Sequence, residues 1–214
     1  MFPLKNKKTY FKYASIPGWL IPFLPWAVWR FSNKEPVIYL TFDDGPHPDT
    51  TTQILQILEK YKAKATFFCT GNQIELYPDL FNSIITNGHQ VGNHTYQHSN
   101  GLKINFSNYI NEIIETEKYI QNKLFRPPYG KMGLRKWWFL RNKYKIIMWD
   151  VMGYDFVQQL SANDCAELII KKVKSGSIIV LHENEKSSDK VAMITRIVLD
   201  HFSKKGFNFS SIQL

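Results

Sequence analysis

The sequence has 214 residues, of which 44% are hydrophobic and 21% are charged, and this composition excludes a disordered chain. Its 11 glycines and 10 prolines also exclude a collagen-like or low-complexity protein. The formal net charge of +9 could attract nucleic acid or an anionic surface, but the basic residues are spread out and no nucleic-acid-binding motif occurs. We therefore expect a basic globular protein without a nucleic-acid partner.

The first 35 residues form a basic, Trp/Pro-rich segment in front of a single domain expected at 36–214. The apolar part, 16–31, is too short to span a bilayer, contains three prolines and lacks a small-residue cleavage site. We expect neither a transmembrane helix nor a cleavable signal peptide, and hence a cytoplasmic or peripherally membrane-associated protein. The segment is interpreted as a strap over one end of the domain. The alternative is weak contact with a membrane surface through Trp19, Trp26 and Trp29.

From residue 36 onward, short β-type runs alternate with segments of helical periodicity. The β-type runs predict strands at 37–42, 65–70, 90–93, 124–126, 146–149, 177–181 and 207–212. The periodic segments predict helices at 50–61, 76–86, 107–121, 135–142, 162–174 and 190–203. Such alternation indicates parallel β/α units. We favour a closed or nearly closed (β/α) barrel, with a doubly wound open sheet as the alternative.

Two of these elements have clear local signals. Ser161 and Asp164 form a possible capping box at the start of the helix at 162–174, and Gly176 is its stop signal. The run Ile178–Leu181 is apolar throughout, as in a strand that is buried on both faces.

Polar residues follow the predicted strands at their carboxyl ends, where a parallel β/α fold places its ligand site. The segments concerned are DDGPH at 43–47, HTYQH at 94–98, RPPYG at 126–130, Asp150 and DF at 155–156, and HE at 182–183. Four of the six histidines and an arginine are among them. We expect these side chains to meet at one rim of the barrel.

The pair His94 and His98 could hold a metal ion, because histidines four residues apart can face one side of a helical turn. An aspartate from Asp43–Asp44 would supply a third ligand, and two histidines with one carboxylate suit Zn²⁺, Fe²⁺, Co²⁺ or Mn²⁺. The second aspartate could then take a proton from water. Taken singly, each motif also fits an ordinary solvated turn.

Five motifs together resemble the NodB-type polysaccharide deacetylases, carbohydrate esterase family four. They occur in the family's order: TFDDGP at 41–46, HTYQH at 94–98, RPPYG at 126–130, DF at 155–156 and LH at 181–182. The resemblance extends from about residue 37 to residue 209. It implies a distorted (β/α)₇ barrel of the NodB-homology type and metal-dependent removal of N-acetyl groups from amino-sugar polymers.

The resemblance also implies roles for individual residues. By position in the motifs, the metal ligands would be Asp44, His94 and His98. Asp43 would be the general base, and Arg126 would keep it ionised and oriented. The cofactor would be one divalent ion, with zinc expected first and cobalt, nickel, manganese or iron as alternatives.

On the opposite side of the metal, the resemblance makes His182 the general acid and Asp155 the residue that orients it. The backbone N–H of Tyr129 would help to stabilise the oxyanion. Leu181 would line a pocket for the acetyl methyl group. The residues expected to contact substrate are Leu181, Phe156, Tyr129 and Pro128.

The fourth motif departs from the family pattern, which usually ends in Asp-Trp, because the second residue here is Phe156. Phenylalanine keeps an apolar groove wall but loses the indole N–H, so we expect catalysis to persist with an altered substrate preference. The expected substrate is a glycan that contains N-acetylglucosamine: peptidoglycan, a chitin oligomer or a surface polysaccharide. The alternatives are an amidohydrolase for small non-sugar amides and a metal-containing, sugar-binding pseudoenzyme.

Overall fold

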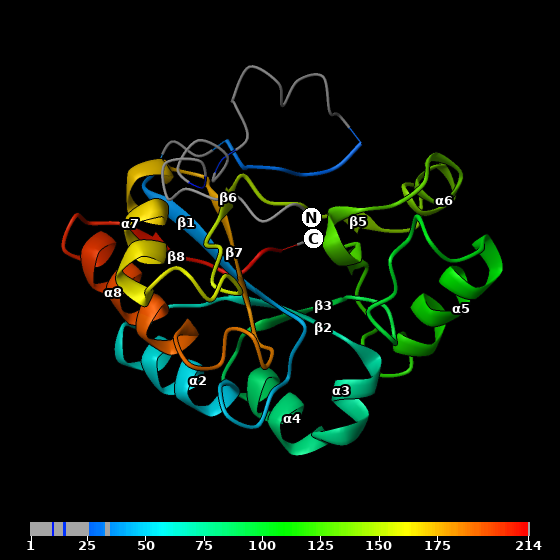
Figure 1. Cartoon of the computed structure of the whole chain (residues 1–214), viewed down its shortest axis with the longest axis horizontal. Helices are drawn as coiled ribbons and strands as arrows, with labels where there is room; N and C mark the ends of the chain where they lie inside the picture. Colours follow the sequence, from blue (N-terminus) through cyan, green and yellow to red (C-terminus); the bar gives the residue numbers. More distant parts are fainter. Residues whose placement is uncertain (1–9, 11–14, 16–25, 33–34, 214) are drawn as a thin grey trace.

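The computed structural model of the chain describes Tyr10, Ser15, residues 26–32 and residues 35–213. In this part, seven parallel strands form one row of a curled sheet in the order β5-β4-β3-β2-β1-β7-β6, and an eighth pairs with the beginning of β1 (Figure 1). The strands are β1 (Val37–Asp43), β2 (Thr66–Cys69), β3 (Gln90–Asn93), β4 (Leu124–Phe125), β5 (Lys145–Ile146), β6 (Val151–Met152), β7 (Ile178–His182) and β8 (Asn208–Phe209).

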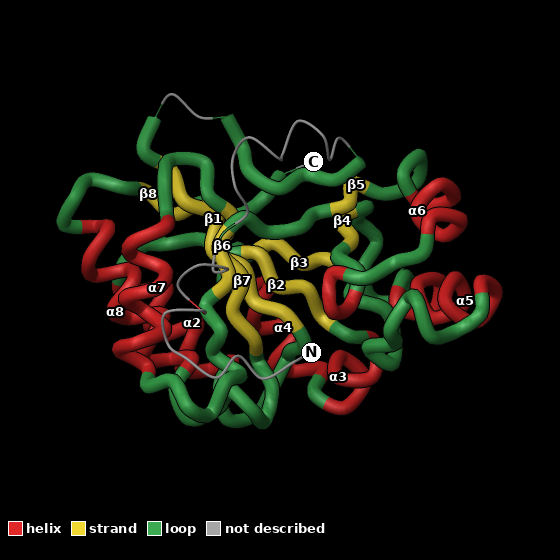
Figure 2. The backbone as a smooth tube through the Cα atoms, turned by 45° about the horizontal axis from the view of Figure 1, so that its top comes forward, coloured by secondary structure: helices red, strands yellow, loops and turns green. Residues whose placement is uncertain are grey.

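The helices follow one another around the outside of this sheet, and each contacts the next, in the order α7, α8, α2, α4, α3, α5 and α6 (Figures 1 and 2). Their bounds are α2 (Thr51–Lys60), α3 (Gly71–Leu76), α4 (Pro78–Thr86), α5 (Phe106–Thr116), α6 (Leu134–Leu140), α7 (Ala162–Lys172) and α8 (Val191–Ser203). A doubly wound sheet would carry helices on both faces. The predicted distorted (β/α) barrel is therefore confirmed in the form of a curled, partly open barrel.

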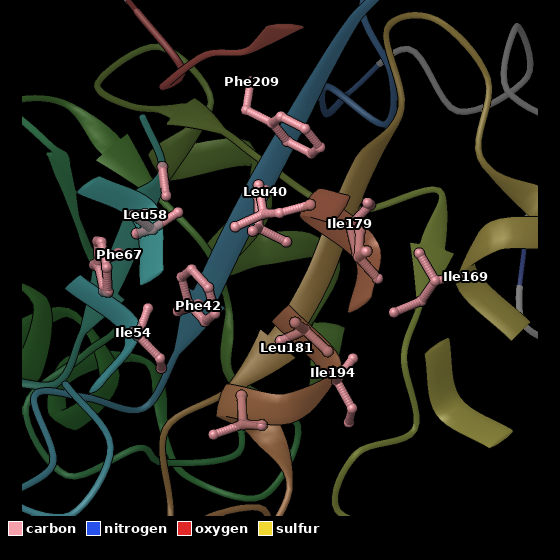
Figure 3. Close-up of a cluster of buried hydrophobic side chains, with 14 of the residues drawn as sticks. Leu40, Phe42, Ile54, Leu58, Phe67, Ile169, Ile179, Leu181, Ile194 and Phe209 are labelled. Carbon is pink, nitrogen blue, oxygen red and sulfur yellow. The ribbon is translucent and has the colours of Figure 1, made fainter. Parts of the chain in front are cut away.

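The main hydrophobic core lies between the central strands and the helices outside them. Leu40 and Phe42 of β1, Ile179 and Leu181 of β7, and Ile194 of α8 belong to one buried cluster (Figure 3). Each of these five side chains is 0% exposed. At about 25 cal/mol per Å² of apolar surface, such burial is the main stabilising term of the fold. It also holds β1 and β7 side by side.

Local signals in the sequence mark some elements correctly and miss others. Ser161 and Asp164 form the expected capping box at the start of α7. The helix expected at 76–86 is α4, which begins at Pro78, and the short helix α3 before it was not expected. Of the strand expected at 146–149, only Ile146 lies in a strand, since β5 ends there, and β6 was not expected.

The described part of the N-terminal segment packs against the sheet at Trp26–Phe31. Val28 donates its N–H to the carbonyl oxygen of Ile146 in β5, and Phe31 donates its N–H to the carbonyl oxygen of Gly176 just before β7. The segment thus reaches from the edge strand β5 to the entry of β7. Trp19 lies outside the described residues. Of the helices that the structure describes, none has the length and apolar character to cross a membrane.

Candidate active site

The carboxyl ends of the strands bring the expected polar residues together. β1 and β7 pair in parallel register, with Asp43 beside His182. β2 and β3 carry the chain toward the same rim, and His94 follows the last residue of β3. The predicted convergence of these residues at one rim is therefore what the structure shows.

Asp43 and Asp44 both contribute to this rim because the strand stops between them. Successive side chains of a regular strand point to opposite faces. At Asp44, however, the backbone has φ 78°, in the left-handed region, and the alternation is broken. As a result, Nε2 of His94 lies 3.9 Å from Oδ2 of Asp43 and 3.4 Å from Oδ1 of Asp44.

A loop, not a helical turn, presents the two histidines. Residues 94–98 are not helical, and both Thr95 and His98 have positive φ angles. The expectation that a helical turn presents His94 and His98 is therefore wrong. Glu112 of α5 fixes the loop by accepting hydrogen bonds from the backbone N–H of Gln97 and the hydroxyl of Ser99.

Three donor atoms face one another at the centre of the rim. Asp44 Oδ1, His94 and His98 each offer one ligand atom, and these atoms lie within 4.8 Å of one another. Nε2 of His98 is 3.0 Å from Asp44 Oδ1. Even so, Oδ1 is buried and has no hydrogen-bond partner among the described residues. An orphaned buried oxygen between two imidazoles fits a cation ligand set.

The ring orientation of His94 supports the same interpretation. Its Nδ1 lies 2.7 Å from the carbonyl oxygen of Arg126. Because a carbonyl only accepts hydrogen bonds, Nδ1 must carry a proton, and Nε2 is the ring nitrogen that faces Asp44. A histidine held in this way by its second nitrogen is typical of metal sites.

The charge state of Asp44 is equally suitable for a cation. Burial by itself raises the pKa of this carboxyl group. The imidazoles of His94 and His98 and the charge on His182 outweigh burial and hold the pKa of Asp44 well below its ordinary value. Asp44 is therefore anionic at neutral pH.

Asp43 is held by a buried arginine. Nη1 of Arg126 donates to Asp43 Oδ1 at 2.6 Å and to the hydroxyl of Thr41 at 2.7 Å. Its other nitrogens donate to the carbonyl oxygens of Ile147 and Met148. The guanidinium is fully buried and lies over the ring of Phe68, so the Asp43 carboxylate has a fixed counter-charge.

His182 is paired with Asp155 at the end of β7. The two side chains meet at 2.9 Å between Nδ1 and Oδ1, and Asp155 Oδ2 also accepts the backbone N–H of His182. Burial by itself lowers the pKa of His182, but the charge and hydrogen bond of Asp155, followed by Asp44 and Asp43, raise it to about 9. His182 is thus protonated at neutral pH.

The residues expected to contact substrate have different surroundings. The ring of Phe156 meets that of His182 edge to face at 5.2 Å. Tyr129 is 58% exposed, and its ring centroid is 4.6 Å from that of His98. Pro128, by contrast, is buried at the start of a 3₁₀ turn (Pro128–Gly130), so it offers a substrate little surface.

The side chain of Leu181 points to the opposite face of β7 from that of His182. This differs from the expectation that Leu181 lines an acetyl pocket. Leu181 is fully buried in the core cluster with Ile169 and Ile194, on the helix side of β7 (Figure 3). Because side chains alternate along a strand, the β7 residue on the same face as His182 is Val180.

Two polar side chains at the site were not predicted as site residues. Thr41 accepts a hydrogen bond from Arg126, and Asn184 donates its amide to Asp44 Oδ2 at 2.5 Å. Asn184 follows the end of β7, so the same rule that located His182 could have located it. Thr41 is the first residue of the TFDDGP motif at 41–46, but the motif match gave it no role.

Comparison with known proteins agrees with this geometry. A family profile described as polysaccharide deacetylase matches residues 31–144, more than half of the chain. The chain belongs to the polysaccharide deacetylase family. A peptidoglycan-N-acetylglucosamine deacetylase from Bacillus cereus is 34% identical over 201 residues, which cover 85% of this chain and 71% of the relative. The family places the chain among hydrolases of linear amides.

A solved member of the polysaccharide deacetylase family has the same architecture. The crystal structure of a peptidoglycan N-acetylglucosamine deacetylase, in complex with a naphthalenyl N-oxidanyl-benzamide, matches with a TM-score of 0.83 and 28% identity. The match covers 92% of this chain and 95% of that one. The relatives differ in length: the match covers between 35% and 91% of the length of three other related deacetylases.

The family fold also occurs in a pseudoenzyme from Bacillus anthracis, which matches with a TM-score of 0.74 and 21% identity over 87% of this chain and 67% of that one. A shared fold therefore does not establish activity. The argument for function rests on the side chains at the rim.

Proposed function

We propose that the protein is a metal-dependent deacetylase that removes N-acetyl groups from glycans containing N-acetylglucosamine. One observation carries the proposal: the ligand set of Asp44, His94 and His98 lies beside an arginine-held Asp43 and near an aspartate-held His182. A protein that only binds sugar needs neither a base nor an acid at this place.

A divalent cation bound by Asp44, His94 and His98 would polarise the acetyl carbonyl and make water more acidic. Zinc suits two imidazoles and one carboxylate best, and cobalt, nickel, manganese and iron are alternatives. The orphaned Oδ1 of Asp44 and the orientation of His94, whose Nε2 faces that oxygen, support this assignment.

Asp43 acts as the general base. It takes a proton from the attacking water while the buried guanidinium of Arg126 keeps the carboxylate oriented. Positioned proton transfer of this kind is worth roughly 10²–10⁴-fold in rate. The backbone N–H of Tyr129, in the turn beside His98, is the protein's own donor to the oxyanion.

His182 acts as the general acid. An amine leaves an amide only when its nitrogen is protonated, and His182 carries that proton at neutral pH because of Asp155. Phe156 packs on the ring edge to face and limits where the imidazole can move. Phe156, which is only partly buried, is the apolar group beside His182 that is offered to the acetyl side of the substrate.

Peptidoglycan is the first substrate to test, because the relatives named above act on it. We would measure acetate release from peptidoglycan fragments, N-acetylglucosamine oligomers and small acetamides, together with metal content on the same sample. Release from the glycans alone supports the proposal. Release only from small acetamides identifies an amidohydrolase, and bound metal without any acetate release identifies a sugar-binding pseudoenzyme.

The pairing of His182 with Asp155 predicts a pH dependence. Because the acid must be protonated, kcat/KM should fall as the pH rises through the pKa of His182, which is raised to about 9 in the metal-free protein. Asp155→Asn removes the main raising charge, so the alkaline limb of the kcat/KM profile should move to lower pH. The conservative Asp155→Glu should move it less. An unchanged limb in Asp155→Asn would show that another group is the acid.

We further propose that residues 1–35 are an appendage of the catalytic domain at 36–214. The contacts of Val28 and Phe31 with the strand ends support a strap, and the exposed Trp26 leaves the alternative of membrane-surface contact open to test. Cosedimentation with anionic vesicles, compared between the wild type and Trp26→Ala, distinguishes the two.

A further inference from the structure

The two oxygens of the Asp44 carboxylate have different surroundings. Oδ1 faces the Nε2 atoms of His98 and His94, at 3.0 and 3.4 Å. Oδ2 accepts a hydrogen bond from the side-chain amide of Asn184 at 2.5 Å. One oxygen is thus turned toward the histidines, and the other is already occupied.

The amide of Asn184 can face Asp44 in only one sense. Its Oδ1 accepts a hydrogen bond from the backbone N–H of Lys186 at 3.0 Å and lies 3.1 Å from the hydroxyl oxygen of Ser187. With the carbonyl end used in this way, the NH₂ end must point to Asp44. Ser187 is itself buried and also donates to the carbonyl oxygen of His182, so the orientation of Asn184 is linked to the end of β7.

The backbone around Asp44 is held separately from its side chain. Glu183 donates its N–H to the carbonyl oxygen of Asp43, and its carboxyl group accepts the hydroxyl of Thr51 at the start of α2. A Cβ added at Gly45 would lie 2.4 Å from the Glu183 carboxyl group, so the turn fits closely. With the backbone supported by Glu183, Asn184 is left to set the rotation of the Asp44 carboxylate.

We propose that Asn184 is a positioning residue for the metal ion: it holds Asp44 as a one-oxygen ligand through Oδ1. This inference rests on the proposed function, because it takes Asp44, His94 and His98 as the ligand set. Since Oδ2 is occupied by the amide, the carboxylate is oriented before the ion arrives, and only one oxygen is free to bind. The remaining coordination positions are left for water and the acetyl group.

The test measures metal binding to Asn184→Leu, which has nearly the same shape but no amide, and to Asn184→Ala. Metal-free proteins are titrated with Zn²⁺ in competition with a chromogenic chelator, and with Co²⁺ followed by visible absorption. We expect Zn²⁺ to bind about 10–100-fold more weakly to both variants, as is usual when a group that orients a metal ligand is lost. The Co²⁺ spectrum should also change, because Asp44 can then use both oxygens.

Asn142→Ala, at an exposed asparagine after α6, is the matched control and should bind like the wild type. The melting temperature of each metal-free variant shows whether folding is retained, and either substitution alone suffices if the other fails to fold. Wild-type affinity and an unchanged Co²⁺ spectrum in a folded Asn184 variant would overturn the inference and leave the proposed function standing. Failure of the wild type to bind either ion would overturn both.

Discussion

Asp43→Asn should lower kcat for acetate release by roughly 10²–10⁴-fold while the protein keeps the proposed metal ion. Asparagine has the shape of aspartate, and its carbonyl oxygen can still accept the hydrogen bond that Arg126 donates to Asp43 Oδ1 at 2.6 Å. It cannot take a proton from water at neutral pH. KM should change little, because nothing else at the rim is removed.

The matched comparison for this prediction is His94→Ala. That variant removes a proposed ligand atom, so it should lose both the ion and the turnover, whereas Asp43→Asn loses turnover alone. Asp79→Asn, at an exposed aspartate in the first turn of α4, should behave as wild type. Kinetics and metal content are measured on the same preparations. Full activity in Asp43→Asn would show that a different group is the base.

The architecture could be predicted because its signals are local and repeated. The run Ile178–Leu181 is buried as expected for a strand covered on both faces. The strand expected at 146–149 failed for a reason outside its own sequence. The carbonyl oxygens of Ile147 and Met148 accept hydrogen bonds from the side chain of Arg126, and β5 ends at Ile146, before β6 begins at the opposite edge of the sheet.

The gathering of the polar residues could also be predicted, because parallel strands end at one edge. Their detailed roles could not be. Leu181 directly precedes His182 in β7, so alternation along the strand places the two side chains on opposite faces, and the motif match alone had assigned Leu181 to the pocket. The contact of Asn184 with Asp44 spans 140 positions along the chain, and a pattern read along the sequence does not reveal such a pair.

Arg126 shows how closely the fold and the site depend on one another. Its guanidinium is fully buried and donates to Asp43, Thr41 and two backbone carbonyls. Arg126→Met keeps an unbranched apolar stem against Phe68 but leaves the buried Asp43 carboxylate without its counter-charge. The expected loss in the free energy of unfolding is about 3–5 kcal/mol, the usual cost of breaking one side of a buried ion pair.

Denaturant unfolding of the metal-free protein measures this loss. Arg196→Ala, at an exposed arginine of α8, is the control and should stay within about 0.5 kcal/mol of wild type. The double variant Arg126→Met with Asp43→Asn is the decisive comparison. If the uncompensated charge is the cause, neutralising Asp43 should restore a large part of the stability that Arg126→Met loses, without restoring activity. Equal destabilisation in the single and double variants would instead assign the loss to the guanidinium's bonds with the carbonyls of Ile147 and Met148. In that case the main role of Arg126 would be to hold the chain segment that connects β5 to β6.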